Sequence, residues 1–250
     1  MPVTSIIFVD LQINTGSRKT KPATTSLPKE YRSVLEETRW LSARAFEVRL
    51  SRPEAFSFRA GQHIRLRCEG LERDYSLISG PEDAHLALCI RHVPGGALTP
   101  HLAARGAGSE LVFAGPHGHF VFRPSDRPVV FVATGTGIAP FAAMVRAGVR
   151  DFLLLHGVRD PEELYYEALF RGAAAEVVPC LTGRGLTERP LPDAFFGRVT
   201  AYIESRLPRQ AYDFYLCGRE EMVRDVTLLV DEAFPGSRVY SEIFFSGPGD

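Results

Sequence analysis

A glycine pair that follows an apolar run is the first feature of this sequence that could bind a ligand. The stretch VVFVATGTGIAP, from Val129 to Pro140, reads as a strand that leads into a G-x-G turn. Such a turn brings backbone N–H groups against a phosphate, because glycine has no Cβ that would hold the ligand away. Pro140 fits the first turn of a following helix, where its missing N–H would have no partner. Taken alone, the stretch is equally compatible with a phosphate site and with a structural turn.

The usual dinucleotide fingerprint is incomplete in this turn. That fingerprint has a third glycine where this chain has Pro140, and it expects an acidic residue after the next strand. Here the next strand leads to His156 and Arg159, so the nearest charge is basic. We therefore expect a nucleotide to approach this turn at a different angle from that in an ordinary Rossmann site.

The first half of the chain is predicted to consist of short strands, which must position any ligand-binding residues that it contributes. Apolar and polar residues alternate there in brief runs that turn residues separate, which predicts an antiparallel β-barrel or sandwich with one short helix near Leu98. The predicted strands are Ala45 to Leu50, His63 to Cys68, Tyr75 to Ile78, Leu86 to His92 and Glu110 to Phe113.

The second half changes to strands that alternate with helices. This order predicts a doubly wound parallel sheet with helices on both faces. A helix is predicted from Glu220 to Phe234, where apolar residues fall on one helical face. The predicted strands are Val129 to Ala133, Phe152 to Leu155, Glu176 to Leu181, Phe214 to Cys217 and Arg238 to Glu242. We expect an extension or linker at residues 1–30, a β-barrel domain at 31–125 and an α/β domain at 126–250.

Composition excludes several classes of partner. A net charge of −1 gives the chain no general attraction to nucleic acid or to an anionic membrane. The four cysteines form no C-x-x-C pair, so zinc-ribbon and iron–sulfur spacings are absent and no metal is expected. No apolar run reaches the length of a membrane span. We therefore expect a cytoplasmic protein.

Five short motifs occur in a fixed order along the chain. They are RDYS at 73–76, VPGGALT at 93–99, GPHGHF at 115–120, GTGIAP at 135–140 and LCG at 216–218. In this order they resemble the ferredoxin–NADP⁺ reductase superfamily, over about residues 31 to 245. The chain is similar to the flavin and pyridine-nucleotide module of bacterial ferredoxin and oxygenase reductases, without an iron–sulfur domain. The resemblance implies FAD on the barrel and a nicotinamide coenzyme on the α/β domain, although GPHGHF is equally compatible with a structural turn.

The resemblance also implies the residues that bind FAD. Arg73 would pair with the pyrophosphate, because a guanidinium fork suits phosphate oxygens. Tyr75 would lie against the flavin, and Ser76 would form a hydrogen bond near the flavin N5 atom. Further implied contacts are His92, Val93, Gly95, Gly96, Ala97, Leu98, Thr99 and Phe244. An ordinary strand followed by a glycine hairpin is the alternative, and the six residues after Phe244 leave its stacking role open.

The implied coenzyme site lies in the second domain. Its residues are Thr134, Gly135, Thr136, Gly137, Pro140, Cys217 and Gly218, with Arg159, Thr182 and Arg184 near a 2′-phosphate. A 2′-phosphate requires basic and hydroxyl donors, so NADPH is expected, with NADH as the alternative. Ser76, Cys217 and Glu242 are the implied catalytic residues, although a buried core thiol is an equally good interpretation of Cys217.

The implied function is that of a flavin-dependent oxidoreductase. Hydride would pass from NADPH to FAD, and single electrons would leave to a separate ferredoxin, flavodoxin or oxygenase component. We expect a monomer. One alternative is an NAD(P)H-dependent flavin reductase or diaphorase with a small-molecule acceptor. The other is a non-catalytic, flavin-binding regulatory module.

Overall fold

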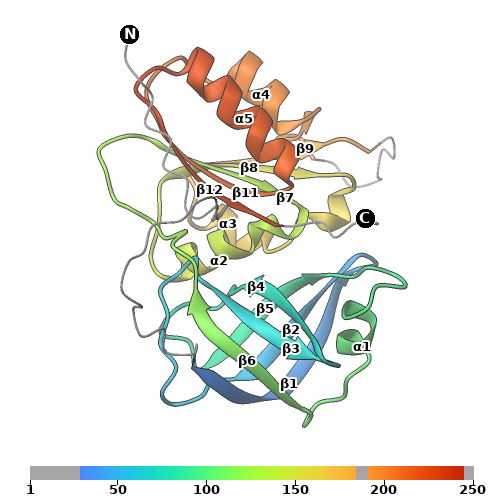
Figure 1. The fold of residues 1–250 in the computed structure, drawn as a ribbon. Helices are drawn as coiled ribbons and strands as arrows, with labels where there is room; N and C mark the ends of the chain where they lie inside the picture. Colours follow the sequence, from blue (N-terminus) through green and yellow to red (C-terminus); the bar gives the residue numbers. More distant parts are fainter. Residues whose placement is uncertain (1–28, 184–190, 245–250) are drawn as a thin grey trace, which may run out of the picture.

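Two layered units make up the protein. A computed structural model of the chain describes residues 29–183 and 191–244. One unit is a six-stranded antiparallel sheet that curls into a barrel, and the other is a six-stranded parallel sheet with helices (Figure 1). The predicted fold class is therefore confirmed.

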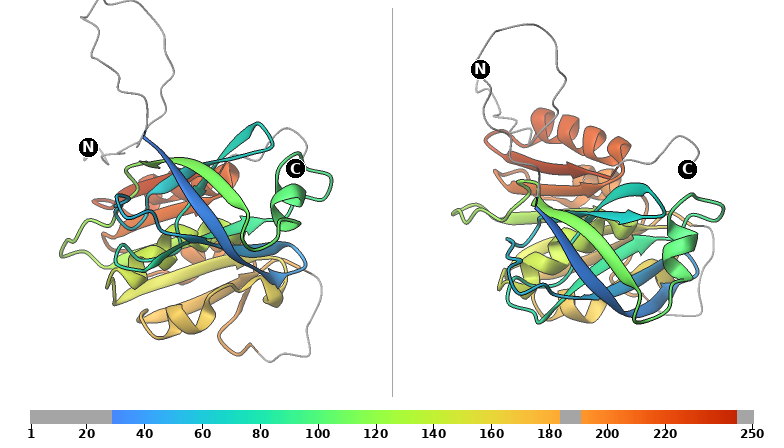
Figure 2. Two further views of the ribbon diagram at one scale, coloured as in Figure 1. Left: turned by 90° about the horizontal axis from the view of Figure 1, so that it is seen from below. Right: turned by 60° about the horizontal axis from the view of Figure 1, so that its bottom comes forward.

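The barrel contains the strands β1 to β6 in the order β4-β3-β6-β1-β2-β5. A bridge between Leu77, just after β4, and Leu88 on β5 brings the two end strands together. β1 and β6 run side by side across the barrel (Figure 2). The strands are β1 Glu30–Ser42, β2 Ala45–Ser51, β3 His63–Cys68, β4 Leu71–Ser76, β5 His85–Arg91 and β6 Glu110–His117. One short helix, α1 (Thr99–Ala103), follows β5, as the sequence predicts.

Two barrel strands differ from the sequence prediction. β4 begins at Leu71 and not near Tyr75, because Glu69 and Gly70 have positive φ angles of 51° and 73° and form a tight hairpin turn. The residues after Ser76 then leave the regular ladder. β1 is 13 residues long and was not among the predicted strands. Its register shifts between Leu35 and Glu37, which breaks the alternation that reveals a strand in the sequence.

The α/β unit has all its strands parallel, in the order β10-β9-β8-β7-β11-β12. Its strands are β7 Val129–Thr134, β8 Phe152–Val158, β9 Glu176–Leu181, β10 Phe195–Phe196, β11 Asp213–Gly218 and β12 Arg238–Ile243. Its α-helices are α2 Ala139–Arg146, α3 Glu167–Arg171, α4 Val199–Arg206 and α5 Glu220–Ala233. Short 3₁₀ turns at Gly135–Ile138 and Pro161–Glu163 complete the unit.

Alternation along β7 explains why helices cover both faces. Phe131 and Ala133 face one core, which they share with α2 and with the end of the barrel. Val130 and Val132 face the other core, beneath α4 and α5. Figure 1 shows α2 and α3 between the sheet and the barrel, with α4 and α5 on the outer face. One face of the parallel sheet is thus sealed by the interface with the barrel.

Polar contacts join the two units at the edge of that interface. The hydroxyls of Ser42 and Tyr165 lie 3.0 Å apart, and the Tyr166 hydroxyl donates to Glu47 at 3.0 Å. The Arg146 guanidinium donates to the Ile78 carbonyl oxygen at 2.6 Å. These contacts hold the barrel against the end of α2 and the segment just before α3.

Candidate active site

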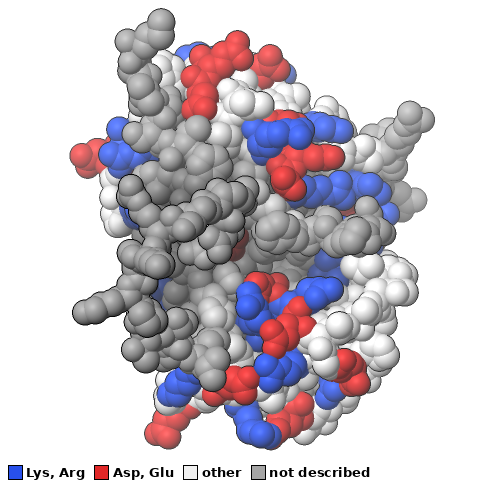
Figure 3. Space-filling view, in the orientation of Figure 1, with Lys and Arg blue, Asp and Glu red and all other residues white. Residues whose placement is uncertain are grey.

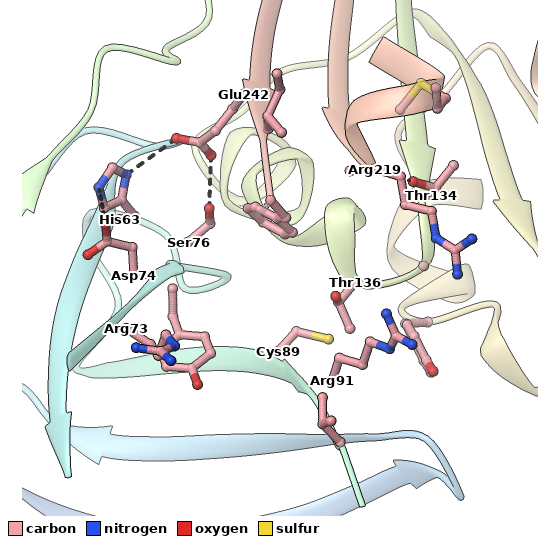
Figure 4. Close-up of a pocket in the computed structure, with 18 of the residues that line it drawn as sticks. His63, Arg73, Asp74, Ser76, Cys89, Arg91, Thr134, Thr136, Arg219 and Glu242 are labelled. Carbon is pink, nitrogen blue, oxygen red and sulfur yellow. Dashed lines mark hydrogen bonds and ion pairs between the residues drawn. The ribbon is translucent and has the colours of Figure 1, made fainter. Parts of the chain in front are cut away.

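A large cavity opens where the barrel meets the carboxyl ends of the parallel strands. Its volume is about 1930 Å³, and residues of both units line it. The strands of a parallel sheet point their last carbonyl groups and following loops to one edge, which is where ligands of such sheets bind. Figure 4 shows Arg73, Ser76 and Arg91 on the barrel side, with Thr136 and Arg219 across the cavity.

Hydrogen bonds cross between the two units inside this cavity. The Ser76 hydroxyl, at the end of β4, donates to the Glu242 Oε2 atom on β12 at 2.9 Å. Glu242 Oε1 lies 3.3 Å from His63 Nδ1 on β3 (Figure 4). Two of the three predicted catalytic residues, Ser76 and Glu242, are therefore in direct contact.

The third predicted catalytic residue lies elsewhere. Cys217 is fully buried in the core that β7, β11 and α2 share, and it is not among the residues that line the cavity. Burial, followed by the nearby Glu242 carboxylate, raises the pKa of its thiol well above the usual value. The structure thus places Cys217 one layer behind the cavity wall, next to Glu242 in the strand register.

The predicted FAD residues of the barrel gather on one wall. Arg73 and Tyr75 line the cavity, and the Arg73 guanidinium donates to the Glu72 carbonyl oxygen at 2.8 Å. Gly95 has a φ of 73°, a conformation that glycine adopts without strain. Thr99 Oγ1 accepts a hydrogen bond from the Val93 N–H at 3.0 Å and so closes the loop on itself. Further barrel residues that line the cavity are His92, Val93, Gly95, Gly96, Ala97, Leu98 and Thr99. Phe244, which follows β12 of the α/β unit, also lines it.

The glycine turn after β7 divides into an exposed part and a packed part. Thr134, Gly135 and Thr136 line the cavity, and Gly135 has a φ of 52° with open space beside it. Gly137 faces the other way: a Cβ there would lie 2.3 Å from the Cys217 carbonyl oxygen. Pro140 lies in the first turn of α2, as predicted, and is buried.

Two neighbouring strand ends lock this turn. A Cβ on Gly218 would lie 2.1 Å from Thr134 Oγ1, and the same oxygen accepts the Arg219 N–H at 3.0 Å. His156 Nε2, at the end of β8, donates to the Gly135 carbonyl oxygen at 3.0 Å. Burial lowers the pKa of His156 to about 4, so the ring is a neutral donor near neutral pH. The turn is held rigid from two sides.

Five arginines of the cavity wall form no ion pair with a carboxylate of the described residues. Arg73 and Arg159 were predicted from the sequence as ligand residues, whereas the other three were not. Arginine is the commonest charged residue of the chain, so nothing in the sequence marked them. The five are Arg73, Arg91, Arg159, Arg198 and Arg219.

Several arginines outside the cavity form ion pairs with carboxylates. On the barrel surface acidic and basic side chains alternate (Figure 3), and Arg67 and Arg105 pair with Glu72 and Glu69. Unpaired guanidinium groups that converge on one cavity are the donor set that an anion with several phosphates requires. The residues present therefore fit a dinucleotide.

Only some of the remaining predicted coenzyme residues lie among the described residues. Thr182, after β9, lines the cavity with Arg159, whereas Arg184 lies outside the described residues. Within the described residues no group of His, Cys, Asp or Glu side chains could hold a metal ion. None of the described helices has the length and apolar character needed to cross a membrane.

Comparisons with known proteins agree with this geometry. Residues 34–122 match the family model of the oxidoreductase FAD-binding domain, and residues 131–227 match that of the oxidoreductase NAD-binding domain. The expected cofactors, FAD and a nicotinamide coenzyme, are those that these two families bind.

Relatives and solved structures give the same result. The chain is 31% identical to ferredoxin–NADP reductase B of Sorangium cellulosum, over 68% of this chain and 78% of that one. It is 30% identical to the toluate 1,2-dioxygenase electron transfer component of Pseudomonas putida, over 79% of this chain. The chain spans only 62% of that relative's length. A ferredoxin NADP⁺ reductase from Neisseria gonorrhoeae shares the fold, with a TM-score of 0.75 and 22% identity over 87% of this chain and 99% of that one.

The order of the two matched domains, the shared fold and the identity to a reductase over most of its length lead to one conclusion. The chain belongs to the ferredoxin–NADP⁺ reductase superfamily.

Proposed function

We propose that the protein is an FAD-dependent NAD(P)H oxidoreductase. It takes two electrons from NADPH and passes them singly to a separate ferredoxin, flavodoxin or oxygenase component. The observation that carries this proposal is a cavity that both units line, where the Ser76–Glu242 hydrogen bond joins them beside five arginines that have no carboxylate partner in the part of the chain that the structure describes. Names of relatives, such as the electron transfer component of toluate 1,2-dioxygenase, support the separate acceptor.

The barrel residues, together with Phe244 after β12, would hold FAD. Arg73 neutralises the pyrophosphate, the loop from His92 to Thr99 surrounds it, and Tyr75 and Phe244 supply aromatic surface for the flavin. The Ser76 hydroxyl of the barrel donates across the interface to Glu242. Bound FAD supplies the exchange between two-electron and one-electron chemistry, while the protein orients it and excludes water.

The α/β residues would hold the nicotinamide coenzyme. Thr134, Gly135 and Thr136 offer a phosphate their backbone and hydroxyl donors, while Gly137 and Pro140 keep the turn packed against β11 and α2. Arg159 and Thr182 are the described candidates for a 2′-phosphate, which supports NADPH over NADH. In this arrangement Cys217 does not touch the coenzyme, and it lies in the core behind the cavity wall as a neighbour of Glu242.

We also propose that the FAD domain ends and the coenzyme domain begins near residue 126. The segment between the two sheets is anchored where the Ser125 hydroxyl donates to Asp213 Oδ2 at 2.5 Å. We assign residues 1–30 to an extension, 31–125 to the FAD domain and 126–250 to the coenzyme domain. A monomeric state and a cytoplasmic location stay predictions.

Spectroscopy of the purified protein tests the proposal. We expect a yellow protein that NADPH bleaches in the absence of oxygen, faster than NADH does. Arg73→Ala should lose most of its FAD, because a charge-assisted pair contributes about 2 kcal/mol, or roughly 30-fold in affinity. Arg224→Ala, which removes an arginine outside the cavity, should keep its FAD. A colourless wild-type protein, or one that neither coenzyme bleaches, contradicts the proposal.

Salt dependence separates the proposal from its rivals. Turnover with a protein acceptor should fall steeply as salt rises, because charge steers such pairs. A flavin reductase or diaphorase with a small-molecule acceptor should respond little to salt. A regulatory module would bind FAD but show no bleaching by either coenzyme.

A further inference from the structure

Glu163 brings a carboxylate to the coenzyme half of the cavity. It ends the 3₁₀ turn Pro161–Glu163, which follows β8, and it lines the cavity. Its Oε2 atom accepts the Arg159 N–H at 3.0 Å. In an ordinary dinucleotide site, an acidic side chain near the end of this strand holds the free ribose hydroxyls of NADH. The fold thus places a carboxylate where the sequence shows a basic residue.

A barrel residue neutralises this carboxylate. Arg44 lies at the tip of the hairpin that joins β1 to β2, and its guanidinium donates to Glu163 Oε1 at 3.1 Å. The Glu163 side chain is 13% exposed, and a charge that is largely withdrawn from water needs a partner. Among the described residues Arg44 is its only ion-pair partner. The charge of Glu163 is therefore compensated by the other unit.

Backbone contacts hold the hairpin tip in place without the Arg44 side chain. The Arg44 N–H donates to Ser42 Oγ at 3.1 Å, and its carbonyl oxygen accepts the His92 N–H at 2.8 Å. The Ser42 hydroxyl in turn lies 3.0 Å from that of Tyr165 on the α/β unit. A substitution at position 44 should therefore change the charge beside Glu163 and leave the hairpin where it is.

The Arg159 backbone is held at both of its polar atoms. Its N–H donates to Glu163, and its carbonyl oxygen accepts the Gly183 N–H at 2.9 Å. A Cβ on Gly183 would lie 2.4 Å from that oxygen, so the two segments are in close contact. Asp160, the next residue, has a side chain that is 41% exposed and lies 3.8 Å from Arg44. Because water screens such a group, Glu163 is the carboxylate that decides the charge beside Arg159.

The 2′-phosphate distinguishes NADPH from NADH, and it carries a charge of about −1.5 to −2 near neutral pH. An uncompensated carboxylate beside Arg159 would repel this group, compete for the guanidinium and favour the ribose hydroxyls of NADH instead. On the basis of the proposed function, we propose that Arg44 neutralises Glu163 and thereby makes the cavity select NADPH. Arg44 is thus a positioning residue of the FAD unit that determines coenzyme specificity through Glu163.

Three variants separate this role from direct binding of the phosphate by Arg44. Arg44→Gln removes the positive charge and keeps part of the stem. Glu163→Gln removes the negative charge and keeps an oxygen that can accept the Arg159 N–H. The double variant Arg44→Gln/Glu163→Gln removes both charges and so has the net charge of the wild type. Arg39→Gln is the matched control, because Arg39 pairs with Glu47 on the same hairpin and lies outside the residues that line the cavity.

Calorimetry on the oxidised holoprotein measures binding without turnover. The probes are adenosine 2′,5′-bisphosphate and adenosine 5′-monophosphate, which differ only in the 2′-phosphate. We expect Arg44→Gln to weaken binding of the bisphosphate about tenfold and to spare the monophosphate. Glu163→Gln, the double variant, Arg39→Gln and the conservative variant Arg44→Lys should all bind the bisphosphate within about twofold of the wild type or more tightly. FAD content and melting temperature should be unchanged in every variant.

The double variant gives the decisive outcome. If it binds the bisphosphate as weakly as Arg44→Gln does, Arg44 contacts the phosphate itself and the proposal is overturned. A wild-type affinity in Arg44→Gln overturns it as well. Steady-state kinetics adds a second readout: in Arg44→Gln the KM for NADPH should rise about tenfold with kcat unchanged, while both constants for NADH stay near those of the wild type.

The behaviour of the wild type separates this inference from the proposed function. A wild type that both coenzymes bleach, and that binds the bisphosphate no more tightly than the monophosphate, overturns the role of Arg44 and leaves the oxidoreductase function intact. A wild type that neither coenzyme bleaches overturns both.

Discussion

The Ser76 hydroxyl donates a hydrogen bond of 2.9 Å to the Glu242 carboxylate, across 166 positions of sequence. The donor belongs to the barrel and the acceptor to the last strand of the α/β unit. This contact ties the two halves of the cavity together.

Removal of the Ser76 hydroxyl should slow coenzyme-driven reduction while FAD stays bound. We expect Ser76→Ala to lower the rate of anaerobic bleaching by roughly 10²-fold, the usual effect of losing a positioned proton donor. Stopped-flow absorbance at saturating NADPH measures the rate. Ser205→Ala, on the exposed side of α4, serves as the control and should react like the wild type. An undiminished rate in Ser76→Ala would exclude the hydroxyl from the reaction.

Two arginines of the coenzyme side should differ in what they recognise. Arg159→Ala should raise the KM for NADPH about tenfold and spare that for NADH, because a 2′-phosphate is present only in NADPH. Arg198→Ala, at the start of α4, provides the comparison within the same cavity. Steady-state kinetics gives the KM of each of the two variants for NADPH and for NADH. Equal losses with NADPH and NADH in Arg159→Ala would refute its role in selecting the phosphate.

Protonation of His156 should destabilise the fold as pH falls. Burial holds its folded-state pKa at about 4, below the unfolded value, so the unfolded chain takes up the proton first. The stability that His156 contributes is present above about pH 6.5 and is lost as the pH falls toward 4. Between pH 7.5 and 5 this loss is about 2 kcal/mol.

Urea unfolding of the wild type and His156→Gln checks this effect. The glutamine amide can still donate to Gly135 but does not titrate, so the variant should lose about 2 kcal/mol less than the wild type over the same pH range. Parallel pH profiles of the two proteins would contradict the assignment.

Gly137 should tolerate no side chain, because its role is close packing. Gly137→Ala would push a Cβ to 2.3 Å from the Cys217 carbonyl oxygen, and we expect a loss of about 3 kcal/mol in the free energy of unfolding. Gly106→Ala has open space around it and should change stability by less than about 0.5 kcal/mol. Equal stability of both variants would show that the backbone yields at Gly137.

Much of the architecture is already determined by the sequence. The change from alternating apolar runs to strand–helix units predicted an antiparallel barrel or sandwich, then a parallel sheet, in that order, because these periodicities depend on local geometry. The strand that begins at Val129, the helix that begins at Glu220 and the short helix after Gly96 all occur as predicted. The motifs around Arg73 and Gly135 likewise predicted which loops line the cavity, because those motifs are contiguous in the chain.

Only the tertiary structure decided which side chains meet. Cys217 and Glu242 are neighbours in the sheet register, yet Glu242 faces the cavity while Cys217 is buried in the core behind it. The arginines Arg91, Arg198 and Arg219 resemble any surface arginine in the sequence, and only the fold places them around one cavity without a carboxylate partner among the described residues. His63 acquires its place between two carboxylates from β3, β4 and β12 together. Such contacts depend on how distant strands pack, and no local pattern encodes that.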